Sequence, residues 1–266
     1  MLLINAGAQL NLHPDRTGEF FAWAIPVTLT AAFLGVGYWA AVPSLVMAIR
    51  TTRWAEVRIV LIAAVALMTT ELIATLRDFG PFLLFDAPAL ARVSAWVWVI
   101  GYIALPPLNA AGILLNRNTA TARPSTATKL RPWALVVLAV YAVALTVLGL
   151  GLLFVSGIFD AVWPWPVSRL TAGAISGWLL LLAVSCWWGL RERVWAAVRI
   201  VIPFYVLWSA FQLVNVARFR DDLVDGPRPV VYVIALAVSL VVFAAIGLIH
   251  ERAARSAAPR PTPVAA

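Results

Sequence analysis

Three polar side chains lie inside long apolar stretches of the chain. A partial internal repeat in the sequence places two of them at equivalent positions. Glu71 is the one acidic residue away from the ends of such a stretch, and the repeat places Gln212 at the matching position. Asn215 lies three residues beyond Gln212, so that the two share one face if the stretch is a helix. A carboxyl group inside a membrane is costly and by default suggests a functional site. We therefore expect Glu71, Gln212 and Asn215 to bind a ligand, and Glu71 to suit proton coupling or cation binding.

Two further residues could line the same site. Asn109 follows Pro106 and Pro107, which remove backbone hydrogen bonds and kink a helix. Trp208 lies deep in an apolar stretch, where it could face a pocket or pack in the core. The alternative for the polar residues is structural, because amides and carboxyls often hydrogen-bond one membrane helix to another.

The remaining residues offer no recognisable catalytic or metal-binding set. His13 and His250 are the only histidines, and both lie outside the apolar stretches. Cys186 is the only cysteine, which excludes an intrachain disulfide and a cysteine-based metal cluster. The sequence therefore predicts no catalytic residues, no metal, no cofactor and no enzymatic activity.

Seven long apolar stretches must position these residues. Each reaches the roughly 20 residues that cross a hydrocarbon layer as a helix, and none shows the alternation of a barrel strand. The sequence therefore predicts an all-α polytopic membrane protein with seven transmembrane helices. The stretches are 20–49, 55–76, 88–115, 132–155, 167–190, 196–217 and 229–249.

Composition and charge support this interpretation. The chain is 63% hydrophobic and 12% charged, with a net charge of +8. Basic residues gather at the ends of the stretches, which indicates lipid rather than nucleic acid as the partner. Thirteen of the 20 basic residues follow the first, third, fifth and seventh stretches. The positive-inside rule then predicts a protein of the cell inner (plasma) membrane with its N-terminus outside and its C-terminus in the cytoplasm.

The repeat groups the predicted helices. Arg50, Trp54 and Arg58 match Arg191, Trp195 and Arg199 at one constant offset along the chain, which we call the repeat offset. We expect two parallel three-helix repeats joined by helix four, a layout similar to that of SWEET transporters. The predicted segments are 1–19 (extracytoplasmic), 20–116 (first half), 117–156 (cytoplasmic loop and helix four), 157–252 (second half) and 253–266 (disordered cytoplasmic tail).

Two motifs carry a more specific resemblance. Residues 20–38 read FFAWAIPVTLTAAFLGVGY, and residues 163–167 read WPWPV. Leu170, Thr171, Ala172, Gly177 and Trp178 follow the second motif. This pattern resembles a family of uncharacterised bacterial multi-pass membrane proteins common in actinobacteria. The resemblance implies a seven-helix fold and no particular chemistry.

Two functions remain open at this stage. The first is a small-molecule binder or transporter whose site lies between the halves, with a cavity there. The second is a non-catalytic scaffold or accessory subunit with a filled centre, whose partner is another membrane protein.

Overall fold

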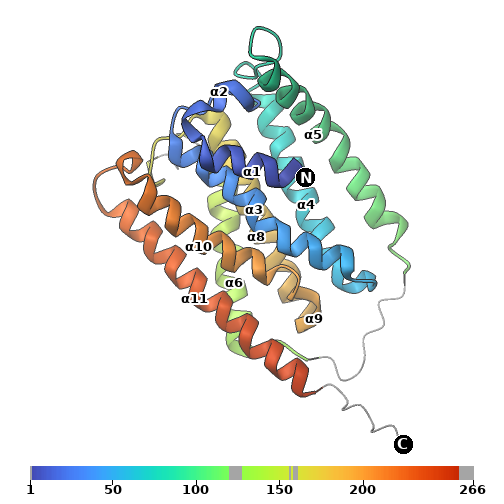
Figure 1. The fold of residues 1–266 in the computed structure, drawn as a ribbon. Helices are drawn as coiled ribbons and strands as arrows, with labels where there is room; N and C mark the ends of the chain where they lie inside the picture. The colour runs from blue at the N-terminus through green and yellow to red at the C-terminus, as the bar shows by residue number, and fades with distance from the viewer. Residues whose placement is uncertain (1, 120–127, 156, 158–160, 258–266) are drawn as a thin grey trace, which may run out of the picture.

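The computed structural model describes residues 2–119, 128–155, 157 and 161–257, which form helices joined by loops, with two isolated antiparallel bridges and no strand among the described residues. Six helices are long and apolar enough to cross a membrane, so the protein is an integral membrane protein. The element order is α1 (Leu2–Leu12), η1 (Pro14–Arg16), α2 (Thr17–Phe20), α3 (Thr28–Arg50), α4 (Trp54–Arg77), α5 (Ala89–Leu115), α6 (Pro132–Phe154), α8 (Arg169–Glu192), α9 (Trp195–Val198), α10 (Ile202–Arg218), η2 (Arg220–Asp222) and α11 (Pro227–Ser256) (Figure 1).

The helix at the sixth predicted stretch is shorter than expected. The stretch 196–217 is divided between α9, which ends at Val198, and α10, which begins at Ile202 and has 17 residues. Pro203 explains the division, because proline is tolerated in the first turn of a helix and disrupts a helix interior. The six qualifying spans are therefore α3, α4, α5, α6, α8 and α11.

The N-terminal segment is part of the helix bundle. Residues 2–12 form α1, which packs along α3. The backbone carbonyl of Ile4 accepts a hydrogen bond from Trp39 Nε1 at 3.2 Å, and Leu10 is fully buried. Trp39 lies 11 residues after the start of α3, about 17 Å along the helix. The start of α1 therefore lies part-way along α3 rather than beyond its end.

Helices α3 and α8 form the centre of the bundle, and each packs on a helix from the other half of the chain. Helix α8 packs on α4 and α6, whereas α3 packs on α10 and α1. Helices α5 and α11 lie outermost, against α4 and α10 respectively (Figure 1). A Cβ atom added at Gly173 would lie 2.6 Å from the Cβ of Ala74, so glycine permits the close crossing of α8 and α4.

Contacts between distant parts of the chain connect the helices at both ends of the bundle. At the end where α3 begins, Asp222 accepts hydrogen bonds from the Leu29 backbone N–H at 2.7 Å and from the Thr28 hydroxyl. At the opposite end, Arg58 pairs with Glu192 at 2.6 Å and Arg199 with Glu56 at 3.2 Å. The two arginines, matched by the repeat, thus each bind a carboxylate from the other half of the sequence.

The C-terminal helix continues past the predicted start of the tail. Helix α11 extends to Ser256, so the first residues of the segment 253–266 are helical. Residues 258–266 lie outside the described part of the chain, as do residues 120–127 of the predicted cytoplasmic loop.

Candidate functional site

A cavity of about 410 Å³ lies between α3, α4, α5 and α8, with α1 and the first turn of α10 completing its wall. Its lining is mostly aliphatic and aromatic, and no residue along it is charged. The volume falls within the range of sites for small molecules and cofactors. Because α3, α4 and α5 precede helix α6 whereas α8 and α10 follow it, both halves of the sequence contribute to the wall.

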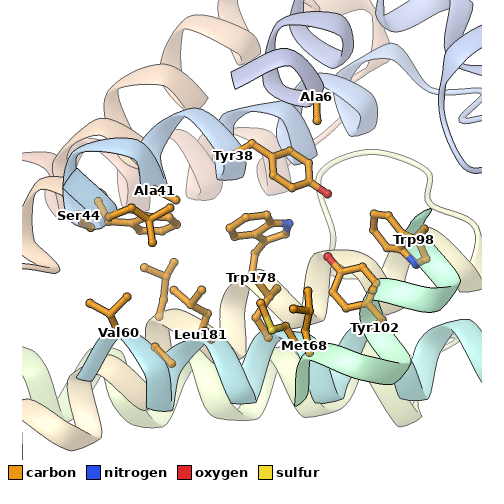
Figure 2. Close-up of a pocket in the computed structure, with 18 of the residues that line it drawn as sticks. Ala6, Tyr38, Ala41, Ser44, Val60, Met68, Trp98, Tyr102, Trp178 and Leu181 are labelled. Carbon is orange, nitrogen blue, oxygen red and sulfur yellow. The ribbon is translucent and has the colours of Figure 1, made fainter. Parts of the chain in front are cut away.

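Two tyrosines and a tryptophan supply polar groups within this apolar space. The hydroxyl groups of Tyr38 on α3 and Tyr102 on α5 point toward one another, and the indole nitrogen of Trp178 lies on the side of its ring nearest to them (Figure 2). The rings of Tyr38 and Trp178 meet edge to face, with centroids 5.4 Å apart. Trp98 packs on Tyr102 at 4.5 Å and donates its indole N–H to Thr75. The two hydroxyls are therefore held by rigid aromatic neighbours.

Glu71 lies next to this tyrosine pair. Its side chain is 1% exposed, and its carboxyl group interacts electrostatically with both Tyr38 and Tyr102. The carboxyl occupies space left by Gly177 on α8, where an added Cβ would come within 2.5 Å of Glu71 Oε1. Glu71 thus belongs to the interface of α4 with α8, beside the cavity rather than on its wall.

Gln212 and Asn215 lie together in a second polar group, which we call the amide cluster. Gln212 Nε2 donates to the Phe33 carbonyl at 3.1 Å, and Asn215 Nδ2 donates to Asn11 Oδ1 at 3.4 Å. Asn11 in turn donates to the Gly7 carbonyl at 2.9 Å. Gln212 Oε1 is buried without a hydrogen-bond partner among the described residues. The amide cluster therefore joins α10 to α3 and α1, on a different set of helices from Glu71.

Trp208 lies between the two polar groups. Its ring meets Phe33 edge to face at 4.9 Å and lies 6.0 Å from Trp178. Since Gln212 binds the Phe33 backbone and Trp178 lines the cavity, Trp208 connects the amide cluster to the cavity through aromatic contacts. It packs in the core and is not among the residues that line the cavity.

Asn109 lies at the far edge of the cavity. Its amide donates to the Leu105 carbonyl of its own helix at 2.8 Å and lies 3.5 Å from Met68 Sδ. Leu105 and Met68 both line the cavity. Pro106 and Pro107 remove the helical donors to the carbonyls of Tyr102 and Ile103, so the amide, which binds Leu105, does not replace either of those bonds.

Sequence reasoning placed no weight on Tyr38, Tyr102 or Asn11. The two tyrosines are isolated polar groups within apolar stretches, and that isolation is the signal that could have found them. Asn11 falls in an apolar segment of only 11 helical residues, too short to be taken for a membrane helix. Its contact with Asn215 depends on the packing of α1 into the bundle.

Comparison with known proteins adds no relative. No protein-family model, no curated protein and no solved structure matches the chain. The resemblance to an actinobacterial membrane family and the similarity to the SWEET layout therefore stay predictions.

Proposed function

We propose that the protein binds a small molecule inside the membrane, in the cavity between the two halves of the bundle, as a carrier or receptor for that molecule. The observation that carries this proposal is the cavity itself, whose mostly apolar wall comes from both halves and in which the hydroxyls of Tyr38 and Tyr102 face one another. A few convergent polar groups in a large apolar pocket are typical of ligand sites. The scaffold alternative requires a filled centre, so the cavity favours binding.

The packing supports a repeat of four helices rather than three. The contacts of α1 with α3 correspond to those of α6 with α8, because a Cβ at Gly7 would meet Trp39 and the Gly35 carbonyl, whereas one at Gly149 would meet Leu180 and the Ser176 carbonyl. Trp39 and Leu180 are separated by the repeat offset, as are Gly35 and Ser176. At the same repeat offset, the packing of α3 on α10 corresponds to the packing of α8 on α4.

We infer from this register that α1, α3, α4 and α5 form one repeat and α6, α8, α10 and α11 the other. Helix α6 then opens the second repeat instead of serving as a linker. Both repeats run in the same direction through the membrane, as the sequence predicts. The site lies between them, which is where a parallel-repeat transporter binds its substrate.

The arginine distribution supports an orientation in the plasma membrane. Arg58, Arg199 and Glu192 lie at one end of the bundle, which we assign to the cytoplasmic side. Reporter fusions after Ala87 and after Arg117 should then report the exterior and the cytoplasm respectively. The reverse pattern would overturn the orientation.

Binding is tested by filling the cavity. Gly101 lines it on α5, and an added Cβ would meet only Leu105 Cδ1 at 3.8 Å, so Gly101→Leu fits without a backbone clash. Gly112→Leu is the matched control, because it makes the same change on the same helix away from the cavity, with nothing within 4 Å. Native mass spectrometry of protein purified from membranes should detect a bound small molecule on the wild type and on Gly112→Leu.

We expect the bound fraction to fall at least about tenfold in Gly101→Leu, since an overfilled site costs more than about 1.4 kcal/mol. Equal occupancy of both variants would place the molecule elsewhere. No bound molecule on any of the three proteins, in several mild detergents, would favour the scaffold function.

A further inference from the structure

The cavity is elongated in the direction in which the helices cross the membrane. On α5 its lining extends from Ser94 to Leu105, about 17 Å along the helix axis. On α3 it extends from Tyr38 to Leu45, and on α4 from Val60 to Met68. A space of this form accommodates an extended hydrocarbon chain better than a compact polar solute.

The rim of the cavity faces the lipid. Val97 and Leu105 both line it, yet their side chains are 54% and 40% exposed on a helix that spans the membrane. Exposed apolar residues at that depth are in contact with lipid chains. A molecule can therefore pass sideways from the bilayer into the cavity along α5, without crossing water.

The tyrosine hydroxyls of the cavity lie deep in the membrane. Tyr38 follows the start of α3 by ten residues, about 15 Å, which is half of a hydrocarbon layer roughly 30 Å thick. A phospholipid keeps its charged headgroup at the membrane surface, because moving charge to the bilayer centre costs several kcal/mol. A ligand of Tyr38 and Tyr102 must instead carry an uncharged polar group.

We propose, resting on the binding function above, that the cavity takes an uncharged lipophilic molecule with one hydroxyl or carbonyl group, which enters from the bilayer. The chain of the molecule lies against Met68, Leu105 and Leu181. Its polar group lies at Tyr38 and Tyr102, with the indole N–H of Trp178 as a further donor.

Photolabelling tests this ligand class. The wild-type protein in phosphatidylcholine vesicles is illuminated with hexadecanol that carries a diazirine in its chain, and the labelled peptides are identified by mass spectrometry. We expect label on peptides that contain Gly101–Leu105 and Trp178–Leu181. Gly101→Leu should lose most of it and Gly112→Leu should retain it. A phosphatidylcholine with the same diazirine chain should label exposed residues such as Ile100 and Leu108 without enrichment at Trp178.

Competition in the wild-type protein tests the polar group without any variant. Unlabelled hexadecanol should compete about fivefold better than hexadecane, the effect of one hydrogen bond. Tyr102→Phe should reduce that preference, whereas Tyr141→Phe, on α6 and off the cavity wall, should leave it unchanged. Equal competition by the two molecules would overturn the proposed role of the tyrosines.

The experiments distinguish a failure of the proposed binding function from a failure of the proposed ligand class. If native mass spectrometry shows a molecule that Gly101→Leu displaces, but hexadecanol gives no label in the cavity, the site exists and the ligand class is wrong. If phosphatidylcholine labels Trp178 as strongly as hexadecanol does, the cavity holds ordinary membrane lipid and the present inference is overturned. If neither probe labels the cavity and nothing is displaced, the binding function itself fails.

Discussion

The helix pairs α1–α3 and α6–α8 cross in the same way, but they differ in the length of the first helix and in the burial of the second. In each pair a glycine lets the first helix approach the second, Gly7 beside Trp39 and Gly149 beside Leu180. Helix α6 has 23 residues and continues along α8 as far as Gly189, whereas α1 has 11 residues. The most apolar 18-residue window of α8 is 78% buried, whereas that of α3 is 44% buried.

The two pairs differ in how deeply the central helix is buried, yet both central helices line the cavity. The part of α3 from Tyr38 to Leu45, toward and beyond the reach of α1, lines the cavity. The positions of α8 that match Ala41 and Ser44 at the repeat offset are Leu182 and Ser185, and both also line the cavity. Helix α6 covers α8 further along, at Gly189, where an added Cβ would lie 2.9 Å from Leu138 Cδ1. The longer α6 thus accompanies the deeper burial of α8, whereas equivalent positions of both central helices contribute to the site.

The largest effect is expected from the two matched glycines. Gly7→Ala places a Cβ 2.4 Å from Trp39 Cδ1, and Gly149→Ala places one 2.8 Å from Leu180 Cγ. Each should destabilise the fold by about 1–3 kcal/mol, the cost of overpacking. Thermal unfolding in detergent, followed by circular dichroism, measures the loss, with Gly112→Ala as the control. A silent Gly7→Ala would break the correspondence between α1 and α6.

Substitutions at Gln212 and at its counterpart Glu71 should destabilise the fold to different extents, and both by less than the most damaging glycine substitution. Gln212→Leu removes the hydrogen bond to the Phe33 carbonyl and should cost about 1–2 kcal/mol. Glu71→Gln should cost less than about 0.5 kcal/mol, below the net contribution of one hydrogen bond, because glutamine keeps the size of the buried side chain and can still hydrogen-bond. The same unfolding assay compares the two variants. If both variants lost the same unfolding free energy, the carboxyl group of Glu71 would itself stabilise the contact between α4 and α8.

The smallest effect concerns the first turns of the two central helices. Ser168 caps α8 locally by accepting from the Thr171 N–H, whereas α3 is capped by Asp222 from the distant segment η2. Ser168→Ala and Asp222→Ala should each cost about 1 kcal/mol. Hydrogen exchange should show the difference, since only Asp222→Ala loosens two segments, the start of α3 and residues 220–222. Protection of both segments in Asp222→Ala would show that the cap is dispensable.

Much of the membrane architecture follows from the sequence. The apolar stretches predict most ends of α3, α4, α5, α6, α8 and α11 to within a few residues. Helix α11 continues to Ser256 rather than ending at residue 249, and the one exception at the start of a helix is α3, which begins at Thr28 rather than at residue 20. Pro26 explains the exception, because the residue before a proline is disfavoured in the helical conformation. The repeat offset also identifies Arg58 and Arg199 as equivalent, and both form ion pairs across the halves.

The candidate site was only partly predictable. The sequence indicates that Glu71, Gln212, Asn215, Trp208 and Asn109 are unusual, because polar or large groups inside apolar helices need partners. It does not indicate that Gln212 would bind the Phe33 backbone or that Glu71 would lie against Gly177. Such contacts join residues far apart in the sequence, and they depend on which helices cross.

By itself the sequence determined a helical membrane protein, because hydrophobicity and length act locally along the chain. Only the tertiary structure decided that α1 packs into the bundle, that Tyr38 meets Tyr102, and that a cavity lies between them. The physical reason is that lipid provides little hydrophobic drive for helix association. Helix pairing then depends on the fit of glycines and large side chains, as at Gly7 and Trp39, which appears only when distant surfaces meet.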